Sequence, residues 1–375
     1  MKIIINTTNL RWGGGIQSAS SLLNEWNLND YLNHEFYVFL SPAVQKELAE
    51  VSFHSNFHFF NFNGSPASLK HRKQINEKLD LLEQEIAPDI VYTIFGPAYW
   101  QPKNFHVEGF ALGWITNPES IAYRKLPLLN RFKKKLENRY KILHLKREAD
   151  HYIVETNDVK EKLSKVLKIS REKITVIGNT YNTFFDNPEF PHLALPPKKD
   201  GVFRMITISH FYVHKNLDIL QKVIPILNKS NLKFEFVLTI DDNNFRKHFS
   251  EFKEYIINVG PVDSKYCPSL YQQSDALFLP TLLESFTASY PEAIRMGLPI
   301  LTSNYSFARE ICQDAALYFD PLNPNDIAQK IILLASDSKI KDDLVRRGKR
   351  ILKAFETPES RAKKTLALLE TIKNR

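Results

Sequence analysis

Short apolar runs alternate with segments of helical length along almost the whole chain of 375 residues. The runs are rich in Ile, Val, Phe and Tyr, and polar or turn residues bound them, which is typical of buried strands. Strands that alternate with helices lie parallel, because each helix returns the chain to the same end of the sheet. The alternation therefore predicts an α/β protein with doubly wound parallel sheets.

The first half of the chain shows the pattern most fully. We expect strands at residues 2–6, 36–40, 57–61, 89–94, 108–114, 151–155 and 174–178. We expect helices at residues 16–26, 43–50, 69–85, 126–148 and 158–167. The pattern restarts with the apolar run FRMITIS at residues 203–209 and continues to a charged helical end.

The segment NPEFPHLALPPKKDG, at residues 187–201, interrupts this alternation. It contains four prolines and follows neither a helical nor a strand period, so we interpret it as an interdomain linker. A chain of this length exceeds one compact core. We therefore expect Rossmann-like domains at residues 1–186 and 202–357, and a helix at 358–375 that crosses back to the first domain.

The composition excludes several classes of protein. Hydrophobic residues make up 43% of the chain and charged residues 25%, as in ordinary globular proteins. The chain starts with a strand, MKIIIN, so we expect no signal peptide, and no apolar run is long enough to predict a membrane-spanning helix. Two cysteines, Cys267 and Cys312, are too few for a disulfide framework and fit a reduced cytoplasmic interior.

Basic residues are concentrated in one segment. The net charge is +8, and residues 124–147 contain ten Lys or Arg and one acidic residue, interleaved with Leu, Ile, Phe and Tyr. A basic amphipathic helix of this kind is typical of segments that lie on an anionic lipid surface, and it equally fits a solvated helix face. Nothing resembles a recognition helix or an aromatic stacking platform, so we expect no nucleic-acid partner.

Two carboxylates frame the centre of the second half. Glu284 follows a buried strand, and Glu292 lies in the first turns of the next predicted helix. Ser285, Phe286 and Thr287 lie at the expected helix entrance, where unpaired N–H groups favour a phosphate. A carboxylate one turn further can accept hydrogen bonds from ribose hydroxyls. Each acid taken alone also fits an ordinary loop or helix-terminal position.

The first strand of each half is followed by further candidate residues. Gly13, Gly14 and Gly15 open the first helix, where glycine lets a backbone approach a ligand closely, although a plain tight turn also fits. Lys215 and His210 lie at the edge where doubly wound sheets bind ligands, so both could reach a phosphate there. A lysine at a helix start is otherwise commonly just solvated.

These motifs resemble the family 4 glycosyltransferases, which have the GT-B fold. The resemblance rests on ESFTASYPEAIRMGLPI at residues 284–300, with NVGPVD and SLYQQSDALFLP upstream and AREI and AALYFDP downstream. In the first half, IVETNDVKEKL and ITVIGNTYN resemble the family loosely. The resemblance implies two Rossmann-like domains facing each other across a cleft, the first binding the acceptor and the second the nucleotide-sugar donor.

The resemblance also implies a retaining, metal-independent transfer that needs no cofactor besides the nucleotide sugar. By the resemblance, Glu292 contacts the ribose of the donor and Glu284 contacts its sugar. Lys215 contacts the diphosphate, together with residues 13–15 and 285–287, and the backbone near Val262 contacts the base. The chemistry agrees, because cationic and amide donors that are already in place lower the barrier to departure of a nucleoside diphosphate.

Three features depart from the family pattern. His210 stands where the family usually has an arginine, and His titrates near neutral pH whereas Arg is always charged. We hypothesise that partly protonated His210 contacts the phosphate, or that Arg11 supplies the missing guanidinium. Ser285 and Thr287 replace two glycines of the usual E-G-F-G and keep its amide donors.

The third departure is on the acceptor side. The segment GWITNPES lacks a histidine that many relatives have, so Thr116 or Asn117 is expected to contact the acceptor instead. The expected function is hexosyl transfer to a glycan or lipid-linked acceptor in cell-envelope polysaccharide synthesis, in the cytoplasm or at the inner face of the cytoplasmic membrane. The alternatives are an epimerase or phosphorylase on the same fold, and a basic module that binds membrane or nucleic acid.

Overall fold

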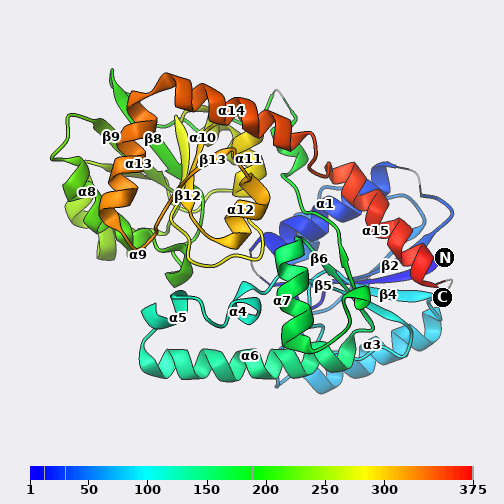
Figure 1. Ribbon diagram of the computed structural model, residues 1–375. Helices are drawn as coiled ribbons and strands as arrows, with labels where there is room; N and C mark the ends of the chain where they lie inside the picture. The colour runs from blue at the N-terminus through cyan, green and yellow to red at the C-terminus, as the bar shows by residue number, and fades with distance from the viewer. Residues whose placement is uncertain (12, 30, 188, 374–375) are drawn as a thin grey trace. The chain divides into compact units, whose positions relative to one another are not determined.

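The computed structural model describes residues 1–11, 13–29, 31–187 and 189–373 (Figure 1). Its contacts divide the chain into two compact units. The first unit comprises residues 1–117, 128–179 and 356–375, and the second comprises residues 118–127 and 180–355. Each unit contains one parallel sheet with helices, so the predicted α/β fold with two Rossmann-like domains is confirmed.

The sheet of the first unit has seven strands in the order β3-β2-β1-β4-β5-β6-β7. The strands are β1 Lys2–Asn6, β2 Glu35–Leu40, β3 Phe57–Asn61, β4 Ile90–Thr93, β5 His106–Phe110, β6 His151–Val154 and β7 Ile174–Val176. Ile4 of the central strand β1 pairs with Tyr37 on one side and Val91 on the other, both in parallel register. Because helices cover both faces of such a sheet, β1 is a continuous apolar run whose Ile3, Ile4 and Ile5 are fully buried.

The C-terminal helix of the chain belongs to the first unit. The helices of this unit are α1 Gly14–Leu28, α2 Pro42–Glu47, α3 Arg72–Ile86, α4 Gly113–Thr116, α6 Leu128–Glu148, α7 Asn157–Leu167 and α15 Pro358–Lys373. Figure 1 shows the red C-terminal helix α15 beside the blue α1. The Trp26 indole N–H donates to the Ala362 carbonyl at 3.0 Å, and Leu366 and Leu369 share an apolar cluster with Leu23. The C-terminal helix therefore completes the core of the first unit.

The sheet of the second unit has six strands in the order β10-β9-β8-β11-β12-β13. The strands are β8 Val202–Thr207, β9 Lys233–Leu238, β10 Ile256–Asn258, β11 Ala276–Leu279, β12 Ile300–Ser303 and β13 Ala316–Phe319. Its helices are α5 Ala122–Lys125, α8 Leu220–Leu227, α9 Asp242–Phe249, α10 Cys267–Gln272, α11 Ser289–Arg295, α12 Ser306–Cys312, α13 Pro324–Ser336 and α14 Ser338–Leu352. The chain runs outward from β8 in one direction and from β11 in the other. The order therefore reverses between β8 and β11, and doubly wound sheets bind ligands at such a point.

Two predicted elements of the first half are wrong in detail. The strand expected at 108–114 ends at Phe110, and residues 113–116 form the helical turn α4, whose Ile115 packs in the same apolar cluster as Phe110. The helix expected from Leu126 begins instead at Leu128, after the separate short helix α5. Leu126 precedes a proline, which disfavours the helical backbone, and it is extended, with φ −77° and ψ 141°.

The proline-rich segment at 187–201 lies within the second unit. The Leu193 amide donates to the Ser269 hydroxyl at 3.0 Å, and the Leu195 amide donates to the Gln273 side chain at 2.9 Å. Leu195 is buried in an apolar cluster of that unit. The segment is thus tethered along the unit that follows it. No helix among the described residues is both long and apolar enough to cross a membrane.

Candidate functional site

Two loops of the second unit meet at the point where its strand order reverses. One loop follows β8 and ends in Lys215, and the other follows β11 and contains Glu284. The His214 carbonyl accepts hydrogen bonds from the Leu282 amide at 2.7 Å and the Thr281 hydroxyl at 3.1 Å. These two bonds join the loops directly, so their side chains are held at a common edge of the sheet.

Asn216 fixes the end of the β8 loop. Its φ is +58°, a left-handed conformation that asparagine tolerates better than most residues. Its side-chain amide donates to the carbonyls of Pro280, at 3.1 Å, and Pro321, at 2.9 Å. A buried side chain that satisfies two loop carbonyls in this way sets the direction in which Lys215 leaves the backbone.

Lys215 and Glu284 form an ion pair. The lysine Nζ lies 2.6 Å from Glu284 Oε1, and the side chains are only 15% and 10% exposed. Thr281 Oγ1 lies 2.8 Å from the same carboxylate oxygen, so its single hydroxyl proton is shared between Glu284 and the His214 carbonyl. The two residues were predicted separately, as a diphosphate contact and a sugar contact, and the structure brings them together. If this ion pair separates, the lysine can contact an anionic group and the carboxylate can contact a polyhydroxyl group.

The amides of Ser285, Phe286 and Thr287 lie beside this pair in the chain. Among the residues that the structure describes, their N–H groups have no hydrogen-bond acceptor. Helix α11 begins only at Ser289, so these amides belong to the loop rather than to the helix entrance that the sequence predicted. Consecutive unpaired amides can still bind an anion, because each carries partial positive charge.

Glu292 lies in α11 with its carboxylate against Tyr271. The tyrosine hydroxyl donates to Glu292 Oε2 at 2.9 Å. Burial raises the pKa of Glu292 to about 7, and the hydrogen bond from Tyr271 only partly offsets this. Val262 packs against the apolar cluster that contains Tyr271. The acid predicted to contact a ribose and the segment predicted to contact a base therefore share one apolar support.

His210 lies in the loop after β8 and is exposed. Its ring lies 5.7 Å from that of Tyr212, which in turn stacks on His214 at 5.5 Å. No contact of His210 with Lys215 or Glu284 is seen in the described part of the chain. The hypothesis that His210 contacts a phosphate stays a prediction.

The glycine run lies in the first unit, where β1 is followed by α1. Gly13 has φ +75° and ψ −161°, a conformation open essentially only to glycine, and no side chain caps α1. A Cβ on Gly15 would lie 3.3 Å from Leu10, so that position is also crowded. The run therefore opens the 15-residue helix α1, in which the Ile16 amide donates to the Gly13 carbonyl at 3.1 Å. Arg11 precedes it and is exposed, and Trp12 lies outside the described residues.

The predicted acceptor-side residues are engaged within the first unit. Thr116 is buried, and its hydroxyl donates to the Gly113 carbonyl at 3.3 Å. The Asn117 amide also donates to that carbonyl, at 3.0 Å, and its oxygen accepts a hydrogen bond from Lys162 at 2.7 Å. Both side chains thus stabilise the turn at α4.

Sequence reasoning missed three supporting residues, namely Tyr271, Thr281 and Asn216. Thr281 lies three residues before Glu284, so its sequence proximity was a usable signal. Tyr271 and Asn216 gave no such signal, because their contacts are distant in sequence. In the described part of the chain, no cluster of three His, Cys, Asp or Glu side chains is arranged to hold a metal ion.

Comparisons with known proteins find sequence similarity over part of the chain. Residues 194–351 match the family model of the glycosyl transferases group 1. An uncharacterised 41.2 kDa protein in the cps region of Klebsiella pneumoniae is 27% identical over 150 residues, which are 39% of this chain and 40% of that protein. The chain thus matches less than half the length of this curated relative.

Solved structures match almost the whole chain. A glycosyltransferase from Rickettsia africae has a TM-score of 0.73 and 17% identity, and the match covers 99% of this chain and 98% of that one. An Anabaena protein, solved in complex with UDP and glucose, has a TM-score of 0.71 and 13% identity, with 99% and 100% covered. At these identities the likeness shows the fold, which is the predicted GT-B fold.

Proposed function

We propose that this GT-B protein, whose second unit carries a group 1 glycosyl transferase domain, transfers a hexose from a nucleotide sugar. The observation that carries the proposal is the ion pair of Lys215 and Glu284, which lies where the strand order reverses and next to three unpaired amides. Phosphate and sugar recognition need this combination of a cation, amide donors and a carboxylate within one loop cluster.

The diphosphate of the donor would bind Lys215 and the amides of residues 285–287. When the bond between the sugar and the diphosphate breaks, negative charge builds on the leaving phosphate oxygens. Donors that are already oriented stabilise that charge without reorganisation. This arrangement supports a transfer that is independent of a metal ion. Support for a nucleotide donor also comes from the Anabaena structure, whose ligands are UDP and glucose.

The two carboxylates would each bind another part of the donor. Glu292, held by Tyr271, would accept hydrogen bonds from the ribose hydroxyls. Glu284 would exchange its contact with Lys215 for the hydroxyls of the sugar as the diphosphate takes over the lysine. The exchange keeps Lys215 paired with an opposite charge and Glu284 hydrogen-bonded, so neither partly buried charge is left without a partner. We propose retention of the anomeric configuration, as the resemblance to family 4 implies.

The proposed acceptor is a glycan or lipid-linked saccharide of the cell envelope. The matched Klebsiella protein is named for the cps region, which supports a role in polysaccharide synthesis. We propose that the enzyme works at the inner face of the cytoplasmic membrane, where lipid-linked acceptors would be available. The basic composition of residues 124–147 supports this location.

The proposed function is tested by thermal stabilisation with a panel of UDP-, GDP-, ADP- and CDP-sugars. A ligand at 100 times its Kd stabilises the folded state by about 2.7 kcal/mol. We expect one class of nucleotide sugar to raise the Tm of the wild type and of the surface variant Glu251→Gln, and to raise the Tm of Lys215→Ala by a smaller amount. If no nucleotide sugar raises the Tm of the wild type, the proposal is wrong.

A further inference from the structure

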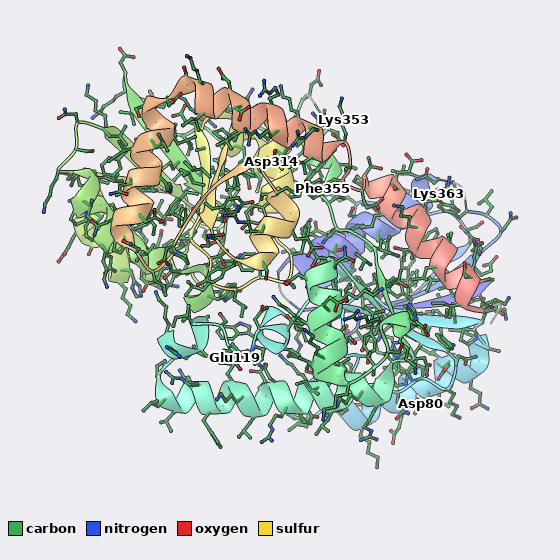
Figure 2. The ribbon with its side chains drawn as sticks, viewed as in Figure 1. Asp80, Glu119, Asp314, Lys353, Phe355 and Lys363 are labelled. Atoms are coloured by element: carbon green, nitrogen blue, oxygen red, sulfur yellow. The ribbon has the colours of Figure 1, made fainter. Side chains whose placement is uncertain are left out.

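Helix α6, residues Leu128–Glu148, exposes large apolar side chains along its length. Leu129 is 85% exposed, Phe132 65%, Leu143 60% and Leu136 48%. Figure 2 shows the side chains of α6 projecting from the helix on the side away from α7. Single exposed leucines are common on protein surfaces, but a row of them on one helix marks an interaction site.

The apolar row lies opposite the buried side of the helix. At about 100° per residue, Leu129, Phe132, Leu136 and Leu143 fall within an arc of roughly 60°. Leu145, which is buried, falls about 180° from the middle of that arc by the same count. A surface helix normally turns its apolar arc toward the core and its polar arc toward water. In α6 this arrangement is reversed, so the fold itself does not account for the apolar row.

The charges of α6 are as uneven as its apolar residues. The helix contains eight Lys or Arg and two Glu. Both acids are already engaged: Glu137 pairs with Lys134 at 3.1 Å and with Lys141 at 2.5 Å, and buried Glu148 accepts from the Tyr99 amide at 2.9 Å. The exposed cations of the helix are Lys133, Lys135, Arg139, Lys146 and Arg147. The apolar row is therefore bordered by positive charge.

We propose that α6 docks on an anionic lipid bilayer, with its apolar row in the acyl boundary and its cations at the headgroups. An interfacial helix needs this combination of Leu and Phe on one face with Lys and Arg beside them. A second copy of the chain fits less well, because two α6 faces would bring their cations together. The inference rests on the membrane location in the proposed function and specifies the surface that makes the contact.

The decisive variant replaces the exposed leucines Leu129, Leu136 and Leu143 with Ser. Its matched control replaces three exposed leucines outside α6, Leu28, Leu32 and Leu322, with Ser. Flotation with vesicles of phosphatidylcholine and phosphatidylglycerol measures the bound fraction, and circular dichroism checks the fold. We expect the α6 variant to lose at least tenfold in partitioning and the control to stay within about twofold of the wild type.

The charge requirement is measured with the same vesicles at low and high salt, and with pure phosphatidylcholine. We expect binding to fall with salt and with removal of phosphatidylglycerol, because headgroup attraction is screened. The proposal is overturned if the wild type does not bind anionic vesicles, if the α6 variant binds as well as the wild type, or if neutral vesicles bind equally. Sedimentation that shows α6-dependent dimers without vesicle binding would assign the face to a second copy instead.

These experiments need neither donor nor acceptor. If the wild type does not bind anionic vesicles but its Tm still rises with the donor, the docking surface is overturned and the proposed reaction stands. If no nucleotide sugar raises the Tm but the wild type still binds anionic vesicles, the proposed reaction is wrong and the docking surface stands.

Discussion

Replacing Glu292 with Gln is expected to stabilise the ligand-free protein at alkaline pH. Burial raises the pKa of Glu292 from 4.5 to about 7, so the folded state holds this proton more tightly than the unfolded chain does. As the pH rises from 4.5 to 7, the unfolded chain ionises first, and the wild type loses stability. The loss is complete above pH 7, where the carboxylate is charged in both states.

The size of the effect follows from the two pKa values. At 1.36 kcal/mol per pH unit, the rise from 4.5 to about 7 corresponds to about 3 kcal/mol. A Gln side chain keeps an oxygen that accepts the Tyr271 hydroxyl but carries no charge, so it avoids this loss. For a unit of this size, 3 kcal/mol corresponds to a Tm increase of roughly 6 °C or more.

The assay is urea unfolding of the wild type and Glu292→Gln at pH 5 and pH 8, with Glu251→Gln as the control for removal of an exposed acid. We expect Glu292→Gln to be close to the wild type at pH 5 and more stable at pH 8. A difference in the free energy of unfolding that is the same at both pH values would show that ionisation of Glu292 does not destabilise the folded state, and so would a loss of stability at pH 8.

Three other perturbations test separate parts of the structure. Lys215→Ala should lower kcat by about 10²–10³-fold, because it removes one donor to the leaving diphosphate, and Lys215→Arg should recover part of the loss in a steady-state assay. EDTA should leave the initial rate of donor turnover within about twofold, since the proposed site uses amides and a lysine; a rate restored only by added Mg²⁺ would contradict this. Arg361→Met should destabilise the first unit by about 3 kcal/mol in urea unfolding, because the buried guanidinium of α15 donates to the Ser18 hydroxyl at 3.0 Å and the Asn179 side chain at 2.6 Å; a change below 0.5 kcal/mol would show that these bonds do not hold α15.

Local patterns predicted most of the fold. Continuous apolar runs identified the strands of the first sheet and the first strand of the second, because strands covered on both faces of a sheet are apolar along their length. The apolar run misled the prediction after Phe110, where the chain leads into the helical turn α4 at residues 113–116 instead of extending β5. The apolar pattern could not distinguish a strand from a helical turn here, because a short apolar run is buried equally well in either structure. Pro127 was a readable signal for the break before α6, and the sequence prediction overlooked it.

The individual residues of the candidate site could be predicted from the sequence, but the contact between Lys215 and Glu284 could not. Lys215 and Glu284 were identified from their positions after strands, which a doubly wound sheet places at one edge. Their direct contact depends on loop hydrogen bonds from Thr281 and Leu282 to the His214 carbonyl, which no local pattern encodes. The raised pKa of Glu292 likewise depends on burial among residues distant in sequence.

We propose that the loops after β8 and β11 hold a nucleotide sugar. Isothermal titration calorimetry with the donor that gives the largest rise in Tm measures this directly, in the wild type, Lys215→Ala and the control Glu251→Gln. We expect one site per chain, unchanged affinity in the control and at least tenfold weaker binding in Lys215→Ala. Binding of the donor to Lys215→Ala as tightly as to the wild type would contradict this proposal.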